Sequence, residues 1–293
     1  LSSFKNTSAV KIPKGFICKN FEQAIQAGRW FLNRKKSCVM KANMGESGWG
    51  ILILKASKFK NLNDFEKYAS TVFASDPIWC QLPIVVEEFI PPLSSIAGGT
   101  PSVEGHITAA GLQITYTCGQ EINFRGEFTG VAIGSEVLPD RLNKELQAIT
   151  KRIGRSFVEL GYRGFFDIDF VLDGTGTPYV LESNTRRTGG THVFDLMRWI
   201  MKKNKVASKL NLFSCDSFVY GNRVASPEEI LKKSEKFLYP MKDSNTGIII
   251  SLIHLEDPII GYIVIERNRK YVSELNTKFV DAWKSASRSS LPK

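Results

Sequence analysis

Hydrophobic and polar residues follow two different periods in the first part of the chain. From residue 20 to 32, apolar side chains recur at the 3.6-residue spacing of a helix, and Asn20 is placed to cap its first turn. Residues 37–43 and 51–57 are predicted to form two strands joined by a glycine-rich turn at 44–50. The chain thus opens with a helix followed by a hairpin.

Helices and hairpins continue to alternate through the middle of the chain. The elements predicted there are a short helix at 61–70, a strand at 83–90, two strands within 101–120, an apolar segment at 128–137, a long helix at 141–161, a hairpin at 167–184 and a helix at 191–203. Gly161 is expected to end the long helix, because glycine readily adopts the left-handed conformation that follows a helix C-terminus.

After about residue 206 the pattern predicts a small α/β unit. Ser226 and Pro227 are typical of a helix N-cap and of the first helical position. Two strands are expected around Asp257 and Pro258, and a last helix is expected at 270–285. The order of elements as a whole predicts an α+β fold that is rich in antiparallel hairpins.

The composition is that of an ordinary globular protein. Its 293 residues are 43% hydrophobic and 23% charged, so the chain can bury a core and form two lobes or domains. The formal net charge of +10 favours anionic partners. The basic residues are spread along the chain, however, and a solvated lysine-rich surface is the commoner explanation. A nucleic-acid-binding protein is a further alternative, but no recognition motif is present and we expect no nucleic-acid partner.

The cysteines and the hydrophobic segments favour a cytoplasmic location. Five widely spaced cysteines without a CxxC pair argue for reduced thiols and against a zinc site or a disulfide framework. The first residues lack the apolar core of a signal peptide, and residues 256–258 interrupt the most hydrophobic C-terminal stretch, so we expect no membrane association. The chain starts without Met and soon enters a helix-like segment, from which we expect that an N-terminal portion is missing.

Acidic residues occupy both strands of the predicted hairpin at 167–184. With the turn centred between Thr175 and Gly176, paired residues have numbers that sum to 351, so Asp169 is expected to face Glu182. Opposed carboxylates repel each other, and a divalent cation removes that penalty. Carboxylate and amide oxygens suit Mg²⁺, and Asn184 is expected on the same face. The alternative is an acidic face that is simply solvated.

A lysine and a glycine-rich loop form a second candidate site. Lys41 lies on a predicted strand, and Gly45, Gly48 and Gly50 follow it in the turn. Glycine lets backbone N–H groups approach a phosphate closely, and lysine adds a positive charge for phosphate oxygens. An ordinary tight hairpin turn is the alternative. The order and spacing exclude a P-loop, a protein-kinase loop and a dinucleotide fingerprint.

These segments together resemble the ATP-grasp superfamily over roughly residues 10–203. The stretches that carry the resemblance are VMKANMGESGWG (39–50), VVEEFI (85–90) and DIDFVLDGTGTPYVLESNTR (167–186). The resemblance implies the ATP-grasp fold, in which two α+β lobes clasp ATP, with a small C-terminal α/β domain here. The expected domains are 1–92, with the glycine-rich loop and hinge, 93–205, with the metal-binding hairpin, and 206–293.

The resemblance also implies roles for particular residues. ATP would be bound by Lys41, Gly45, Ser47, Gly48 and Gly50, and by the hinge residues Glu87, Glu88, Phe89 and Ile90. One or two Mg²⁺ ions, with Mn²⁺ as an alternative, would be bound by Asp169, Glu182 and Asn184. Arg186 would act with Lys41 in catalysis, and Arg125, Arg187, Gly189 and Gly190 are weaker candidates for substrate binding.

A closer resemblance, carried by NTRRTGGTHVFDLMRWI (184–200) and the C-terminal strands, is to the pheganomycin-type peptide ligases. It implies ATP-dependent joining of a small carboxylic acid to an amine, such as an amino acid or peptide, through an acyl phosphate. The alternatives are an ATP-binding module that does not ligate, serving as a regulator or partner, and an ATP-grasp carboxylase or kinase.

The chain departs from the ATP-grasp pattern at two positions. The glutamate that usually contacts ribose would fall near Thr100, and Glu104 is not an evident replacement. Asp167 stands where D-alanine ligases have an arginine, which argues against D-alanine as the substrate.

Overall fold

The chain forms two compact units. The computed structural model describes residues 2–4, 10–46, 48–123, 126–203, 210–241 and 244–288. The first unit comprises Leu1–Leu93, Ile122–Phe128 and Asp169–Glu182, and the second comprises Ser94–Glu121, Thr129–Ile168 and Ser183–Lys293. The division into 1–92, 93–205 and 206–293 stays a prediction.

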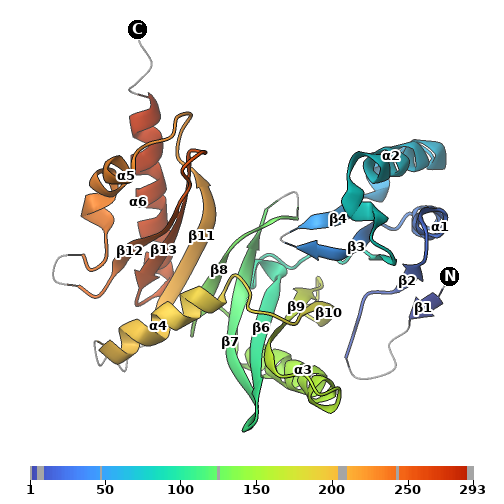
Figure 1. Ribbon diagram of the computed structural model, residues 1–293, viewed down its shortest axis with the longest axis horizontal. Coiled ribbons are helices and arrows are strands. Elements are labelled where there is room, and N and C mark those ends of the chain that lie inside the picture. Colours follow the sequence, from blue (N-terminus) through green and yellow to red (C-terminus); the bar gives the residue numbers. More distant parts are fainter. Residues whose placement is uncertain are drawn as a thin grey trace. The chain divides into compact units, whose positions relative to one another are not determined.

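The first unit is built on a five-stranded antiparallel sheet with the order β1-β2-β5-β3-β4 (Figure 1). Its strands are β1 (Ser2–Phe4), β2 (Gly15–Cys18), β3 (Cys38–Glu46), β4 (Trp49–Leu54) and β5 (Ile84–Glu88). Its helices are α1 (Phe21–Leu32) and α2 (Leu62–Ser75), with the short 3-10 helices η1 (Ala56–Lys58) and η2 (Pro77–Cys80).

The capped helix predicted near the start of the chain is confirmed. The Asn20 side chain accepts a hydrogen bond from the Gln23 backbone N–H at 2.9 Å, as an N-cap residue does. The apolar face of α1 buries Ala24, Ala27 and Phe31 against the sheet and α2. The helical period in the sequence therefore marks the side of α1 that packs into the core.

The second unit contains most of an eight-stranded sheet with the order β10-β9-β6-β7-β8-β11-β13-β12 (Figure 1), and the hairpin residues Asp169–Glu182 of that sheet belong to the first unit. Its strands are β6 (Pro101–Thr108), β7 (Gly111–Ile122), β8 (Phe128–Gly134), β9 (Gly164–Leu172), β10 (Pro178–Asn184), β11 (Asn211–Val219), β12 (Gly247–Ile253) and β13 (Ile259–Glu266). Its helices are α3 (Asp140–Glu159), α4 (Thr191–Lys203), α5 (Pro227–Ser234) and α6 (Arg269–Arg288), with the 3-10 helices η3 (Ala97–Gly99) and η4 (Glu235–Phe237).

The C-terminal strands extend the sheet of the second unit. β11 pairs antiparallel with β8 on one side and with β13 on the other, and β12 completes that end of the sheet. α6 packs on this part of the sheet (Figure 1). The core between them is aromatic and aliphatic, with Phe279 and Tyr262 fully buried at its centre.

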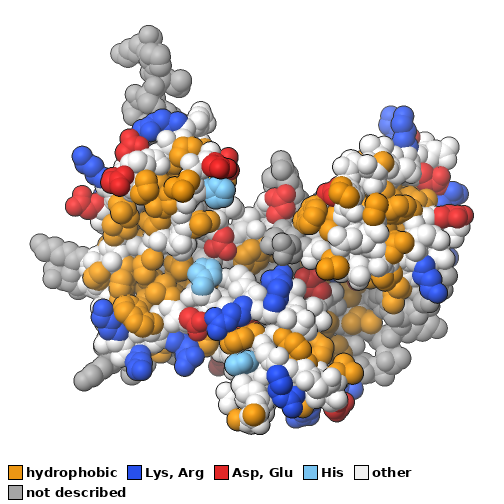
Figure 2. Space-filling model, viewed as in Figure 1, with side chains coloured by type: hydrophobic (Ala, Val, Ile, Leu, Met, Phe, Trp, Pro, Cys, Tyr) orange, Lys and Arg blue, Asp and Glu red, His pale blue; other side chains and the backbone are white. Residues whose placement is uncertain are grey.

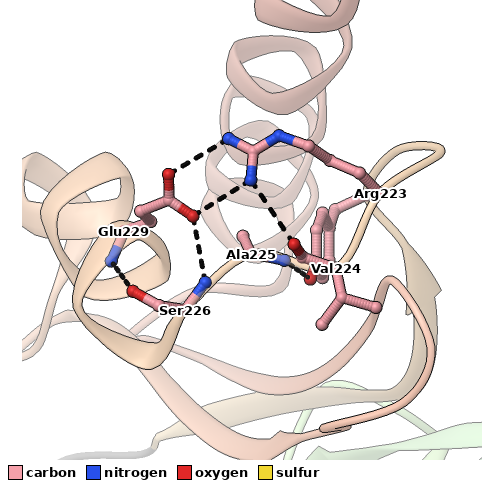
Figure 3. A network of polar contacts seen from close by, with 6 residues as sticks. Arg223, Val224, Ala225, Ser226 and Glu229 are labelled. Atoms are coloured by element: carbon pink, nitrogen blue, oxygen red, sulfur yellow. Dashed lines mark hydrogen bonds and ion pairs between the residues drawn. The ribbon is translucent and has the colours of Figure 1, made fainter.

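The predicted N-terminus of α5 is also confirmed. The Ser226 hydroxyl accepts from the Glu229 backbone N–H, and the Glu229 carboxylate accepts from the Ser226 N–H, which together form a capping box. Arg223 reaches the same carboxylate with two N–H groups at 3.1 Å each (Figure 3). The loop before α5 is thus fixed by the residues that begin the helix.

Charged side chains of both signs lie on the surface, and the cysteines are mostly buried. Lys and Arg side chains are scattered over the visible face and interspersed with Asp and Glu (Figure 2). Cys18, Cys38 and Cys118 are buried, and burial raises the pKa of Cys18 to about 11 and that of Cys38 to about 12. Among the described helices, none combines the length and hydrophobicity that a membrane span needs.

Replacing Phe279 with alanine is expected to lower the free energy of unfolding by about 3–5 kcal/mol, because it empties the centre of the C-terminal core. The exposed Tyr271 on the same helix is the control, and Tyr271→Ala should change stability by roughly 0.5 kcal/mol or less. Urea unfolding of both variants measures this. Equal losses in the two variants would contradict the assigned core.

Candidate functional site

Lys41 lies at the meeting point of three strands of the first unit. Its ammonium group lies 2.5 Å from Glu87 Oε1 on β5 and donates to the Leu181 carbonyl of β10 at 3.3 Å. The Lys41 and Glu87 side chains are 15% and 6% exposed, so this ion pair is largely shielded from water. The pairing of Lys41 with Val85 places Glu87 on the same face of the sheet, two residues along β5.

Glu87 is tied electrostatically to both the lysine and the hairpin. Burial raises the pKa of Glu87, the Lys41 cation opposes that rise, and the Glu182 carboxylate adds to it. A buried carboxylate without the lysine would carry a large desolvation cost. The pair therefore holds the lysine side chain toward the acidic hairpin, and the Glu87 side chain is already engaged within the protein.

The remaining hinge residues differ in how their backbones are used. Glu88 forms an ion pair with Lys36 at 2.6 Å, and the backbone N–H groups of Glu88 and Phe89 both donate to carbonyls of the first unit. The Ile90 N–H has no hydrogen-bond partner among the described residues. Of the predicted hinge amides, this is the one that a ligand can engage without breaking a bond of the fold.

The glycine-rich loop is shorter than predicted. β3 and β4 extend into the predicted turn at 44–50 until Glu46 pairs with Trp49, with a bulge between Lys41 and Glu46. Glycine makes this close pairing possible, because a Cβ on Gly45 would lie 2.3 Å from the Trp49 carbonyl oxygen. Gly48 has a positive φ of 90° and forms part of the tight turn. The turn that connects β3 and β4 is therefore short.

Trp49 is held from outside the turn. Its indole N–H donates to Asp76 Oδ2 at 2.7 Å, while about half of the side chain stays exposed. Asp76 also caps η2 through the Ile78 N–H. Ser47 and Arg125, both predicted to contact ligands, lie outside the described residues.

The turn of the acidic hairpin closes one residue away from the predicted register. The Asp173 N–H donates to the Thr177 carbonyl at 3.0 Å and its own carbonyl accepts from the Gly176 N–H at 2.8 Å, so paired numbers at the turn sum to 350. Gly176 has a φ of 79° and adds an extra residue to the second strand, as in a three-residue hairpin loop with a bulge. The assumed centre of the turn was therefore wrong, because a glycine bulge shifts the register.

The three predicted metal ligands lie on the two strands of this hairpin. Asp169 lies half-buried on β9, whereas Glu182 is exposed on β10 and the half-buried Asn184 follows two residues later. β9 and β10 are neighbours in the sheet. Within the described residues, no three His, Cys, Asp or Glu side chains form a metal-binding group. The predicted ligands include only two such residues, Asp169 and Glu182, because the third is an asparagine. The direct opposition of Asp169 and Glu182 stays a prediction.

Asp173, the remaining acidic residue of the turn, serves the turn itself. Its Oδ1 accepts hydrogen bonds from the backbone N–H groups of Thr175 and Thr177 and from the Thr175 hydroxyl. The Thr175 hydroxyl bond is the main cause that lowers the pKa of Asp173. This aspartate therefore has a structural role in shaping the turn.

Arg186 and Arg187 follow β10 and have different surroundings. The exposed Arg186 guanidinium donates only to the Arg187 carbonyl, at 3.3 Å, and forms no ion pair with a described residue. Arg187 lies over the Phe165 ring at 4.5 Å and is 3.6 Å from Asp195. Of the two arginines, Arg186 is the one left available for an anionic ligand.

The glycine pair before α4 lies against a tyrosine. A Cβ on Gly190 would lie 2.6 Å from Tyr116 Oη, so only glycine fits there without displacing the ring. The backbone N–H of Thr188 donates to the Thr191 hydroxyl, and that of Thr191 donates to the Thr188 carbonyl. These two amides are therefore used locally, and Gly189 and Gly190 are the remaining candidates for binding an anion at this helix N-terminus.

A buried polar cluster in the second unit was not predicted. Its members are Ser102, Glu104, Thr115, Tyr116, Asp167, Thr188 and Thr191. Glu104 and Asp167 are 0% and 1% exposed, and both carboxylates accept hydrogen bonds from hydroxyl groups. The signal in the sequence was the presence of Glu104 and Asp167 within two predicted strands.

Burial raises the pKa of Glu104, and the nearby Asp167 carboxylate adds to that rise, while hydrogen bonds from hydroxyl groups oppose it. The stability that Glu104 contributes is therefore fully present below its ordinary pKa of 4.5 and is lost as the pH rises through the higher folded-state value.

Glu104→Gln is expected to gain stability relative to the wild type as the pH rises from about 4.5 toward 8, because glutamine cannot ionise. Urea unfolding across this range gives the difference in the free energy of unfolding. The exposed Glu159 at the end of α3 is the control, and Glu159→Gln should follow the wild type. A difference that stays constant with pH would contradict the assigned burial effect.

Comparison with known proteins shows the fold. No family profile matches the chain. L-propargylglycine–L-glutamate ligase of Streptantibioticus cattleyicolor is 29% identical over 109 residues, which cover 37% of this chain and 21% of that protein. The matched region is thus about a fifth of the length of this curated relative.

Solved structures resemble nearly the whole chain. N5-carboxyaminoimidazole ribonucleotide synthetase (PurK) in complex with ADP has a TM-score of 0.63 at 12% identity, covering 94% of this chain and 68% of its own. Biotin carboxylase of Campylobacter jejuni with β-γ-ATP has a TM-score of 0.63 at 15% identity, covering 93% and 63%. The biotin carboxylase domain of Hydrogenobacter thermophilus with MgADP has a TM-score of 0.60 at 14% identity, covering 93% and 62%. The chain has the ATP-grasp fold.

Proposed function

We propose that this chain is an ATP-dependent carboxylate–amine ligase that forms an amide bond through an acyl-phosphate intermediate. The observation that carries the proposal is the position of Lys41, which joins the hinge strand to the acidic hairpin within an ATP-grasp fold. The partial sequence match to an amino-acid ligase supports the same reaction class.

The nucleotide would be bound by elements of the first unit. Lys41 would contact phosphate oxygens by exchanging its bond to the Leu181 carbonyl for one to a phosphate. The Ile90 N–H is available for the base. The tight turn of Gly45, Gly48 and Gly50 would lie over the phosphates.

The hairpin residues fit a magnesium ion by their chemistry. Asp169, Glu182 and Asn184 offer two carboxylates and one amide oxygen, the hard donors that Mg²⁺ prefers, and such sites usually leave positions for water and phosphate. When bound, one or two Mg²⁺ ions, or Mn²⁺ in their place, would neutralise negative charge on the phosphate oxygens. Glu182 is exposed, so it can accept an ion without unfolding the hairpin.

The reaction would proceed in two displacements. A carboxylate oxygen of the acid attacks the γ-phosphorus, the bond to the β–γ bridging oxygen breaks, and ADP leaves. The amine nitrogen then attacks the acyl carbon, phosphate leaves and the amine loses a proton. Lys41 and Arg186 would place positive charge near the phosphoryl group during its transfer. Stabilising the charge of the transition state is the main requirement of this chemistry.

The substrates would be a small carboxylic acid and an amine, and the first panel to test is amino acids and short peptides. The chain aligns with only about a fifth of the length of the ligase relative. We propose a cytoplasmic location for the protein.

Lys41→Ala and Glu182→Gln are each expected to lower ATP-dependent turnover by about 100-fold or more, because each removes a charge from the phosphate or metal site. The controls are Lys55→Ala and Glu159→Gln, which alter exposed residues of the same types. ADP release with the amino-acid panel measures turnover, and cooperative thermal unfolding shows that the variants fold. Wild-type turnover in both Lys41→Ala and Glu182→Gln would overturn the site. Tight ATP binding without turnover in the wild type would favour a non-ligating module.

Asp169→Asn is expected to raise the Mg²⁺ concentration needed for half-maximal turnover by roughly tenfold or more, since it replaces a charged ligand with a neutral one. Chelation with EDTA should abolish turnover in the wild type, and added Mg²⁺ should restore it. Asp173→Asn is the comparison, because Asp173 is engaged in the turn, and its effect should appear in stability instead. An unchanged Mg²⁺ requirement in Asp169→Asn would remove Asp169 from the metal site.

A further inference from the structure

The loop between β10 and α4, residues 185–190, is tied to the buried polar cluster at its C-terminal end. The Thr191 hydroxyl donates to Glu104 Oε2 at 2.5 Å and accepts from the Thr188 backbone N–H at 3.1 Å. Thr191 is 4% exposed, so this contact is shielded from water. One buried carboxylate thus fixes both the start of α4 and the last turn of the loop.

A second carboxylate reaches the same loop from another strand. The Thr188 hydroxyl lies 3.5 Å from Asp167 Oδ2 on β9 and 3.2 Å from the Tyr116 hydroxyl on β7. Asp167 in turn accepts from the Ser102 hydroxyl with both oxygens at 2.7 Å. Buried hydrogen bonds to charged acceptors are among the stronger ones, and a lost partner leaves the acceptor unsatisfied.

The middle of the loop is held by an aromatic stack. The Arg187 guanidinium lies over the Phe165 ring at 4.5 Å, and the His106 ring stacks on Phe165 at 3.9 Å with an interplanar angle of 5°. Arg187 also contacts Asp195 on α4 at 3.6 Å. These contacts involve Arg187, Thr188 and Thr191, but they leave the Arg186 guanidinium without an acidic partner among the described residues.

We infer that Glu104 and Asp167 are positioning residues, which fix the loop through the Thr188 and Thr191 hydroxyls so that Arg186 is presented as a free cation. This inference rests on the proposed function, in which Arg186 stabilises the transferring phosphoryl group. If the loop were flexible, ordering Arg186 would cost conformational entropy in each catalytic cycle. Because the loop is fixed at residues 187, 188 and 191, its backbone has already lost that entropy on folding.

Limited trypsin digestion of the full chain tests the anchoring directly, because trypsin cleaves after Arg186 and Arg187. Thr191→Val removes the hydroxyl at nearly constant shape, and Thr191→Ser keeps it. We expect cleavage at these two sites to be about tenfold faster or more in Thr191→Val and close to the wild-type rate in Thr191→Ser. Cleavage after the exposed Lys60 of the first unit is the internal reference.

The kinetic readout separates positioning from folding. In Thr191→Val and Glu104→Gln, kcat is expected to fall by about tenfold or more while the KM for ATP stays unchanged, and Thr191→Ser should restore kcat. Thr108→Val, which alters a hydroxyl at the far end of β6, should resemble the wild type in both assays. If Thr191→Val does not fold, Thr188→Val takes its place.

Each outcome decides the inference. Wild-type cleavage rates in Thr191→Val overturn the anchoring, and faster cleavage with unchanged kcat overturns the positioning role. A wild-type protein without ATP-dependent turnover overturns the ligase proposal and the role of Arg186, whereas the cleavage comparison still tests the anchoring. Faster cleavage with a lower kcat and serine rescue supports the inference.

Discussion

The shielded ion pair between Lys41 and Glu87 organises the first unit. A lysine side chain that is only 15% exposed needs a partner for its charge, and Lys41 has the Glu87 carboxylate at 2.5 Å together with the Leu181 carbonyl. Because these three groups come from β3, β5 and β10, one cation joins the hinge strand to the acidic hairpin. In the proposed nucleotide site, the same lysine would bind the phosphates, so Lys41 would have both a structural and a functional role.

The second unit solves the problem of buried charge in a different way. Glu104 and Asp167 are almost completely buried, and both accept hydrogen bonds from hydroxyl groups. Hydroxyl donors leave the carboxylates costly to remove from water, which is consistent with the raised pKa of Glu104. The cluster connects β6, β7 and β9 to the start of α4. Lys41 is thus the proposed ligand contact, whereas the cluster around Glu104 and Asp167 is proposed to support the loop before α4.

Local signals in the sequence predicted local structure well. Asn20 and the pair Ser226–Pro227 identify helix starts because a cap is a contact between residues three positions apart. The two hairpin turns were harder. Gly176 shifts the register by one residue, and strand pairing extends up to Glu46 and Trp49, since bulges and close strand contacts depend on the backbone conformation of single glycines.

The sequence alone determined the order of elements, the antiparallel character and the resemblance that led to the ATP-grasp fold, because hydrophobic period, capping residues and motif order are properties of neighbouring positions. It also selected Lys41 and Arg186 as candidates. Only the tertiary structure decided that Glu87 pairs with Lys41 and that Glu104 and Asp167 meet Thr188 and Thr191. Such contacts join residues that are tens of positions apart, and burial determines how strong they are.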